Sequence, residues 1–164
     1  MTPGSGTYFV YHTPHGPITI RTEADGVAEI AFGEAALAGE LKPSDLSNRA
    51  ANQLLEYFAG KRRAFDVPLA LHGSDFQQSV WEAVARIPYG QTRTYADVAD
   101  AIGHPGSHRA VGAAVRKNII PLLIPDHRVV GANGVPRGSG AWARLRTPLL
   151  EAERARCAAE RKAR

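Results

Sequence analysis

The pattern of hydrophobic and polar residues gives the chain a β-rich first part and a helical second part. Three short runs of β-branched and aromatic residues lie between residues 7 and 32, separated by the turn signals His15-Gly16 and Asp25-Gly26. These runs are Tyr8–Tyr11, Pro17–Arg21 and Val27–Phe32. Short alternating runs with glycine-containing turns predict an antiparallel meander.

One helix is expected to follow the meander. Residues 33–46 mix alanine with glycine, proline and serine and indicate a loop with a short helical turn. Ser47 is expected to cap a helix that Gly60 ends, because the apolar residues between them recur at helical spacing. A further strand is expected at residues 65–69.

Beyond His72 the apolar positions recur at helical spacing. Ser74 or Asp75 is expected to cap a helix that has Trp81 on its core face. Two short helices, over residues 94–102 and 107–117, are joined by a turn that contains glycine, which is a helix-turn-helix pattern. A final helix is expected to turn Leu145, Leu149 and Leu150 inward.

These elements predict an α+β protein with two domains. Residues 1–72 form a small N-terminal antiparallel sheet with a helix, and residues 73–156 form a helical, winged-helix-like domain with the helix-turn-helix. Residues 157–164 are expected to be a basic tail.

The second helix of the helix-turn-helix pattern has small residues at its centre and arginines near its ends. Gly112, Ala113 and Ala114 leave its middle almost without side chains, so that it can lie close to a partner. Arg109 and Arg116 are surface charges if the helix only packs internally, and phosphate or base contacts if it enters a groove of DNA.

Composition and charge narrow the class of protein. With 164 residues, 44% hydrophobic and 22% charged, the chain is typical of soluble globular proteins. No apolar run approaches the roughly 20 residues of a membrane helix, and the N-terminus lacks a secretory signal, so we expect a cytoplasmic protein with no membrane partner. The net charge of +4 is compatible with a phosphate-bearing partner.

Cysteine and histidine usage argues against a metal centre. Cys157 is the one cysteine, which excludes an internal disulfide and a zinc site built on several thiolates, and we interpret it as a solvated thiol of the tail. The histidines show no ligand spacing. We therefore predict no metal and no cofactor.

The strongest site candidate follows the apolar run at residues 119–124. Pro125 fixes the backbone there, and Asp126, His127 and Arg128 place a carboxylate, an imidazole and a guanidinium in consecutive positions. Ionisable groups after a buried run are expected to lie at the bottom of a cleft, where burial shifts their pKa values.

This segment resembles the active-site signature of the alkylguanine-DNA alkyltransferases, which repair guanine alkylated on its 6-oxygen and have Pro-Cys-His-Arg-Val at this point. The resemblance covers about the C-terminal half of the chain, in the family's order and spacing. The matching segments are Phe76–Trp81, Ile87–Thr92, Thr94-Tyr95, Arg109–Gly112, Asn118 and Pro125–Val129.

The resemblance assigns roles to individual residues. It places Asp126 where the family has its alkyl-accepting cysteine, beside His127 and a glutamate, Glu153, that orients the histidine; these three are the candidate catalytic residues. If the three side chains converge, a protonated histidine or one raised carboxyl pKa is expected.

Asn118 matches the family's hinge between the helix and the active-site strand. The alkyl-group pocket is expected around Pro125, Ser139 and Gly140, although the family normally has a tyrosine and a serine at the last two positions.

For DNA, the resemblance implies contacts in the minor groove. It assigns Tyr95 to rotating the nucleotide out of the duplex and Arg109 to filling the gap that the guanine leaves. The other DNA-binding candidates are Ala110, Gly112 and Arg116.

Three functions remain open at this point. The first is a non-enzymatic protein that binds double-stranded DNA with a flipped, alkylated guanine. The second is an enzyme that acts on a modified nucleobase through Asp126, and the third is a helix-turn-helix module with a vestigial pocket. We expect a monomer, and the sequence leaves open whether repair-pathway proteins are recruited.

Overall fold

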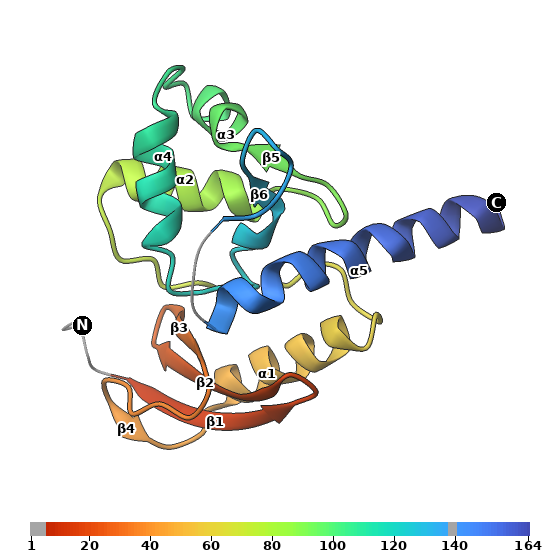
Figure 1. Cartoon of the computed structure of the whole chain (residues 1–164). Coiled ribbons are helices and arrows are strands. Elements are labelled where there is room, and N and C mark those ends of the chain that lie inside the picture. The colour runs from red at the N-terminus through yellow and green to blue at the C-terminus, as the bar shows by residue number, and fades with distance from the viewer. Residues whose placement is uncertain (1–5, 138–140) are drawn as a thin grey trace. The chain divides into compact units, whose positions relative to one another are not determined.

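The computed structural model describes residues 6–137 and 141–164. The chain forms two compact units, Met1–His72 and Gly73–Arg164. The first unit contains a four-stranded sheet and one long helix, and the second contains most of the helices (Figure 1). The predicted α+β class is confirmed.

The sheet of the first unit is the predicted meander with one short addition. Its strands are β1 (Thr7–Thr13), β2 (Gly16–Glu23), β3 (Gly26–Phe32) and β4 (Glu40–Leu41), in the order β3-β2-β1-β4. β1, β2 and β3 pair antiparallel, whereas β4 pairs parallel to β1 within the segment that we expected to be a loop. A strand of two residues carries too little periodicity to be recognised in the sequence.

The helix α1 (Asp45–Phe58) begins earlier than predicted. Ser44 is the N-cap, because its side chain accepts a hydrogen bond from the backbone N–H of Ser47, and the Ser47 side chain accepts one from Ser44 in return. This reciprocal pair is a capping box, in which Ser47 is the third helical residue. The prediction of Ser47 as the cap was wrong by three positions.

The strand expected at residues 65–69 is reduced to one bridge between Val27 and Leu69. Val27 donates a backbone hydrogen bond to the Pro68 carbonyl, and Ala70 donates one to the Val27 carbonyl, each 2.9 Å long. Pro68 has no N–H to extend this ladder, which explains why no strand forms.

The second unit contains the helix-turn-helix that the sequence predicts. α2 (Asp75–Ala85) precedes α3 (Tyr95–Ala101) and α4 (His108–Arg116), which are joined by a short turn. Two short strands, β5 (Arg93–Thr94) and β6 (Val129–Val130), pair parallel to one another.

Trp81 of α2 supports α4 on its buried side. The tryptophan is buried, and its indole Nε1 donates a hydrogen bond of 2.9 Å to the carbonyl of Ala114 on α4. Val80, Val84, Val98 and Val111 complete the apolar packing between these helices. The opposite side of α4 therefore stays available for a ligand.

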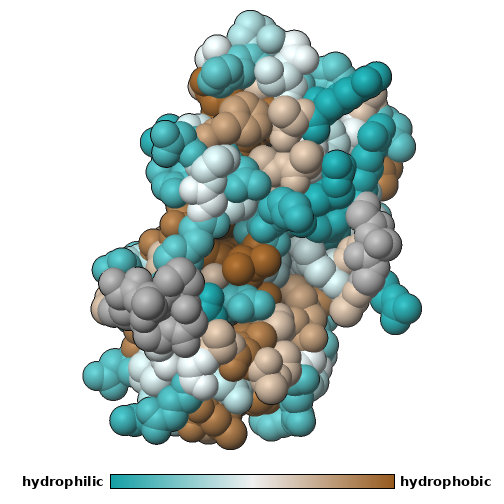
Figure 2. Space-filling view, turned by 90° about the vertical axis from the view of Figure 1, so that its left-hand side faces the viewer, coloured by the Kyte–Doolittle hydropathy of each residue, from teal (hydrophilic) through white to brown (hydrophobic). Residues whose placement is uncertain are grey.

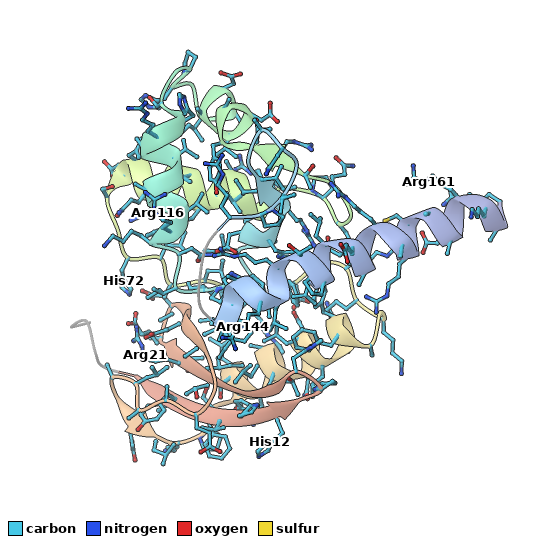
Figure 3. The ribbon with its side chains drawn as sticks, in the orientation of Figure 1. His12, Arg21, His72, Arg116, Arg144 and Arg161 are labelled. Atoms are coloured by element: carbon cyan, nitrogen blue, oxygen red, sulfur yellow. The ribbon has the colours of Figure 1, made fainter. Side chains whose placement is uncertain are left out.

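The helix α5 (Ala141–Ala163) is longer than the sequence predicts. It runs without interruption through the segment that we expected to be a basic tail, with Arg161 near its end (Figures 1 and 3). Alanine, glutamate and arginine are strong helix formers, so this composition favours continuation of the helix. Cys157 is a half-buried helical residue, with Sγ 3.9 Å from the Tyr89 carbonyl oxygen, rather than a solvated tail thiol.

None of the helices in the described part of the chain combines the length and the apolar character that crossing a membrane requires.

Candidate functional site

The apolar run before Pro125 forms a tight turn. Ile124 donates a backbone hydrogen bond to the Ile120 carbonyl, and Leu122 takes a left-handed conformation with φ of 74°. This conformation is uncommon for a branched residue and costs on the order of 1–3 kcal/mol. The turn leads through the buried Pro125 into the 3₁₀ helix η1 (Asp126–Arg128).

All three ionisable residues of η1 are buried, which the sequence predicts for Asp126 and His127. However, the side chains of Asp126, His127 and Glu153 do not converge into one cluster. Asp126 contacts residues of the first turns of α5, whereas His127 and Arg128 both contact Glu153 further along the same helix.

Asp126 has donors on both carboxylate oxygens. Trp142 donates from its indole Nε1 to Oδ1 over 2.6 Å, and Asn118 donates from Nδ2 to Oδ2 over 3.0 Å. Arg146 Nε lies 3.3 Å from Oδ1. Burial raises the pKa of Asp126, although the charge of Arg146 and the hydrogen bonds from Trp142 and Asn118 act in the opposite direction.

Glu153 is the centre of a second, fully buried cluster. Its Oε2 lies 2.6 Å from His127 Nε2, and Arg128 donates to both of its oxygens, from Nε over 2.9 Å and from Nη2 over 3.1 Å. The backbone N–H of Gly90 donates to Oε1 over 2.9 Å. Burial alone would raise the pKa of Glu153, but the hydrogen bonds and charges of His127 and Arg128 lower it well below its ordinary value.

The pKa values of the two carboxyl groups are therefore shifted in opposite directions. Glu153 is held as an anion between two cationic or donating side chains, and Asp126 is the carboxyl whose pKa is raised. Environments that shift the pKa values of two acids in opposite directions are common at functional sites.

Asn118 connects α4 to the turn. Besides its bond to Asp126, its Nδ2 donates to the Ile124 carbonyl over 3.1 Å, and its Oδ1 accepts from the backbone N–H of Ile120 over 2.9 Å. This amide fixes the path of the chain between α4 and η1.

A cavity of about 340 Å³ lies beside α4, which is within the size range of ligand pockets. Its lining residues are Tyr95, His108, Arg109, Gly112, Val115, Arg116, Arg137 and Arg146. Figure 2 looks onto the side of the unit that carries α4, where hydrophilic side chains gather, and Figure 3 places Arg116 on this helix.

The cavity brings together four of the five residues that we predicted to contact DNA. Tyr95, Arg109, Gly112 and Arg116 line it, whereas Ala110 is exposed and does not. The structure thus gathers these four residues around one cavity.

The small residues of α4 do not share one bare face. Gly112 lines the cavity, Ala113 is exposed, and Ala114 is buried beneath Trp81. Successive helical residues are separated by about 100°, so three in a row cannot face the same side. Only Gly112 keeps the surface beside the cavity open.

Sequence reasoning missed three residues of the site. Trp142 and Arg146 both reach Asp126, and the guanidinium of Arg137 lies 5.9 Å from the ring centre of Tyr95. The four-residue spacing of Trp142 and Arg146 indicates that they share a helix face, which was the available signal. The predicted pocket residues Ser139 and Gly140 lie outside the described residues.

Within the described ranges, no three histidine, cysteine, aspartate or glutamate side chains are grouped so that they could hold a metal ion.

Both units match domains of one class of DNA-repair proteins. Residues 7–71 match the 6-O-methylguanine DNA methyltransferase, ribonuclease-like domain, and residues 75–155 match the 6-O-methylguanine DNA methyltransferase, DNA binding domain. The chain belongs to the 6-O-methylguanine DNA methyltransferase family, which confirms the resemblance found in the sequence.

Similar proteins cover nearly the whole chain. The methylated-DNA-protein-cysteine methyltransferase of Methanosarcina acetivorans is 40% identical over 151 residues, which are 89% of this chain and 97% of that protein. The constitutive methylated-DNA-protein-cysteine methyltransferase of Bacillus subtilis is 39% identical over 90% of this chain and 94% of its own. The crystal structure of Mycobacterium tuberculosis OGT in complex with DNA aligns with a TM-score of 0.83 and 40% identity, over 92% of this chain and 94% of that one.

Proposed function

We propose that this protein binds double-stranded DNA and holds a flipped, alkylated guanine beside α4 without accepting its alkyl group. The observation that carries the proposal is the set of contacts made by the Asp126 carboxylate. We place Asp126 where the family has its acceptor cysteine. Its Oδ1 already accepts a hydrogen bond from Trp142 and its Oδ2 accepts one from Asn118, while Arg146 forms an ion pair with Oδ1.

The chemistry of a carboxylate supports binding over transfer. A carboxylate whose two oxygens accept hydrogen bonds from an indole and an amide is a weaker nucleophile than a free carboxylate, which is itself much weaker toward carbon than a thiolate. An alkyl ester formed at Asp126 would be hydrolysable, so a stable one-time transfer is disfavoured.

The cavity beside α4 supports a base-flipping mode of binding. A base atom that is hidden in the duplex becomes accessible only when the nucleotide leaves the stack. Tyr95 and Arg109 both line the cavity, in keeping with the roles of rotating the nucleotide and filling its vacated place. The DNA bound to the Mycobacterium tuberculosis relative supports DNA as the partner.

One observation favours an enzymatic alternative. Asp126 is a buried carboxyl with a raised pKa, which is a property of general acids. An enzyme that hydrolyses a modified base through Asp126 is therefore the second candidate.

Incubation with a duplex that contains one O6-methylguanine separates these functions. We expect tighter binding of this duplex than of the unmodified one, with the intact mass of the protein and the methylated base both unchanged. A protein adduct would establish alkyl transfer, and a methylguanine converted without an adduct would establish turnover. Equal binding of both duplexes would leave only a DNA-binding module.

A further inference from the structure

We propose that Arg146 is the residue that reads the flipped base, and that Asp126 is a positioning residue that holds Arg146 in place. The ligand class is a purine that presents two adjacent acceptors, the 6-oxygen and N7, as guanine and O6-alkylguanine do. This inference rests on the proposed function, because it requires a base in the cavity beside α4.

Arg146 differs from the other arginines of the cavity in how firmly it is held. Its side chain is only 14% exposed, whereas Arg109, Arg116 and Arg137 are exposed. An exposed arginine is suited to flexible contact with a phosphate, but a half-buried one has lost much of its rotamer freedom before any ligand arrives.

Three contacts fix the guanidinium of Arg146. Its Nε lies 3.3 Å from Asp126 Oδ1, its Nη1 donates to the Arg137 carbonyl, and its Cζ lies 5.7 Å from the ring centre of Trp142. A planar donor group that is held from several sides is oriented in advance, which reduces the cost of binding.

The position of Asp126 makes it a support rather than a contact. Its side chain is 2% exposed and is not part of the cavity lining, whereas Arg146 both lines the cavity and contacts Asp126. A base that enters the cavity therefore meets the guanidinium, and the carboxylate lies behind it.

The donors of Arg146 match the edge of a guanine. Arginine carries five N–H donors in a planar fork, and the hydrogen bond to the Arg137 carbonyl uses only one of them, while Nε faces Asp126 in an ion pair. Paired N–H groups of arginine recognise the 6-oxygen and N7 of guanine. Alkylation leaves both atoms as acceptors, whereas adenine presents an amino group beside N7 and would oppose a donor with a donor.

The charge balance also fits recognition of a neutral base. The ion pair with Asp126 offsets the positive charge of Arg146 where the side chain is largely out of water. Such pairs add little to stability, but they set the geometry of the groups that they hold.

The test combines a change in the ligand with a change in the protein. One duplex carries a single O6-methylguanine, and a second carries its 7-deaza analogue, in which N7 is replaced by carbon. For the wild-type protein we expect about ten-fold weaker binding of the 7-deaza duplex, within the range for loss of part of a bidentate contact. Arg146→Met should bind the methylguanine duplex at least about ten-fold more weakly than wild type and show no difference between the two duplexes.

Arg144→Met is the matched control, because Arg144 is an exposed arginine at the start of the same helix (Figure 3). Loss of a phosphate contact there would weaken both duplexes equally and leave the ten-fold ratio intact. Asp126→Ala should reduce the ratio, and Asp126→Asn, which keeps an acceptor for Trp142, should retain part of it.

The ratio of the affinities for the two duplexes does not change when a substitution only damages the structure, because such damage would weaken the binding of both duplexes alike. If wild type prefers methylguanine over guanine but binds the 7-deaza duplex equally well, or if Arg146→Met keeps the ratio, Arg146 does not read the base while the proposed function stands. If wild type shows no preference for methylguanine over guanine, the proposed function fails and this inference fails with it.

Discussion

The indole of Trp142 donates a hydrogen bond of 2.6 Å to Asp126 Oδ1, the oxygen that also lies 3.3 Å from Arg146 Nε. Trp142 and Arg146 stand four residues apart on α5, and Asp126 begins η1. The first turns of α5 are therefore part of the site and are not only a support for the active-site segment. Changes in this helix should alter the properties of Asp126 directly.

Trp142→Phe should raise the pKa of Asp126 further. Burial already raises this pKa, and the hydrogen bond from Trp142 opposes the rise because it stabilises the charged form. Phenylalanine keeps an aromatic ring but has no donor. A carbon-13 NMR titration of the aspartate carboxyl groups would measure the shift, and an unchanged midpoint for Asp126 would mean that the indole does not stabilise the carboxylate.

Glu153→Gln should destabilise the protein at neutral pH by about 3–5 kcal/mol, because it leaves the buried guanidinium of Arg128 without its counter-charge. The pKa of Glu153 is lowered in the folded protein, so its stabilising effect is present above the unfolded value of about 4.3 and is lost as the pH falls below it. The gap in unfolding free energy between wild type and variant should therefore narrow below about pH 4. Denaturant unfolding across pH 3–8 measures this gap, and a gap that stays constant with pH would contradict the assignment.

Asp126→Asn is a control for the same measurement, because the effect of pH on the difference in unfolding free energy is expected to have the opposite sign. The pKa of Asp126 is raised in the folded state, so its contribution is fully present below the unfolded value of about 3.9 and is lost as the pH rises through the folded pKa. Relative to this variant, wild type should lose stability as the pH increases.

Local patterns predicted the elements of this protein better than they predicted its site. The period-two runs at β1 to β3 and the helical spacing around Trp81 each involve neighbouring residues, so their signals are strong in the sequence. The cap at Ser44 was missed because Ser44 and Ser47 are both suitable caps, and only the reciprocal hydrogen bonds decide between them.

The arrangement around Asp126 depends on contacts between distant segments. His127 and Glu153 were paired through the family resemblance, but the contribution of Trp142 was not foreseen, because a tryptophan near leucines is usually a core residue. Nothing in the sequence singled out Arg146. Its burial against Asp126 follows from the path of α5, which no local pattern encodes.

Gly112→Leu should abolish binding of duplex DNA while the fold survives. A side chain at Gly112 would project toward the cavity, where a Cβ atom lies 3.6 Å from Arg116 and 3.8 Å from Tyr95. A methyl group fits these ordinary contact distances, so Gly112→Ala should bind nearly as wild type, whereas leucine fills the cavity. Fluorescence anisotropy with labelled duplex would compare them, and tight binding by the leucine variant would remove α4 from the interface.

Wild-type affinity for duplex DNA should fall steeply with salt. Arg116 is exposed beside the cavity, and contacts of such a residue with phosphates release counterions. The same anisotropy titration at several salt concentrations gives the slope, and an affinity independent of salt would exclude phosphate contacts as a major source of binding.

Arg109→Ala should lose the preference for a modified base more than it loses overall affinity. The guanidinium is proposed to occupy the place of the flipped nucleotide, so its removal acts on the flipped state. The measurement is the ratio of dissociation constants for methylguanine and unmodified duplexes. An equal loss of affinity for both duplexes would make Arg109 a phosphate contact. Arg116→Ala serves as the comparison, because we assign Arg116 to contact with the DNA phosphates.

The final prediction concerns Asp126→Cys, which would restore a cysteine at the position that we propose for the family's acceptor. His127 and Glu153 remain 2.6 Å apart, and Arg146 would favour a thiolate beside it. The single variant should nevertheless stay inert, because Trp142 and Arg146 enclose this position and its present side chain is only 2% exposed. An indole that is hydrogen-bonded directly to this side chain leaves little room beside it for an alkyl carbon.

Asp126→Cys combined with Trp142→Ala should therefore accept an alkyl group in a single turnover, because the second change opens the approach to the thiolate. Intact-mass spectrometry after incubation with a methylguanine duplex would detect the added methyl group, and Trp142→Ala alone is the control that has no thiol at residue 126 and keeps Cys157. If the single cysteine variant is alkylated as fast as the double one, Trp142 does not shield the site. If neither is alkylated although both bind the duplex, the alkyl carbon does not reach residue 126, and the position assigned to the flipped base must be revised.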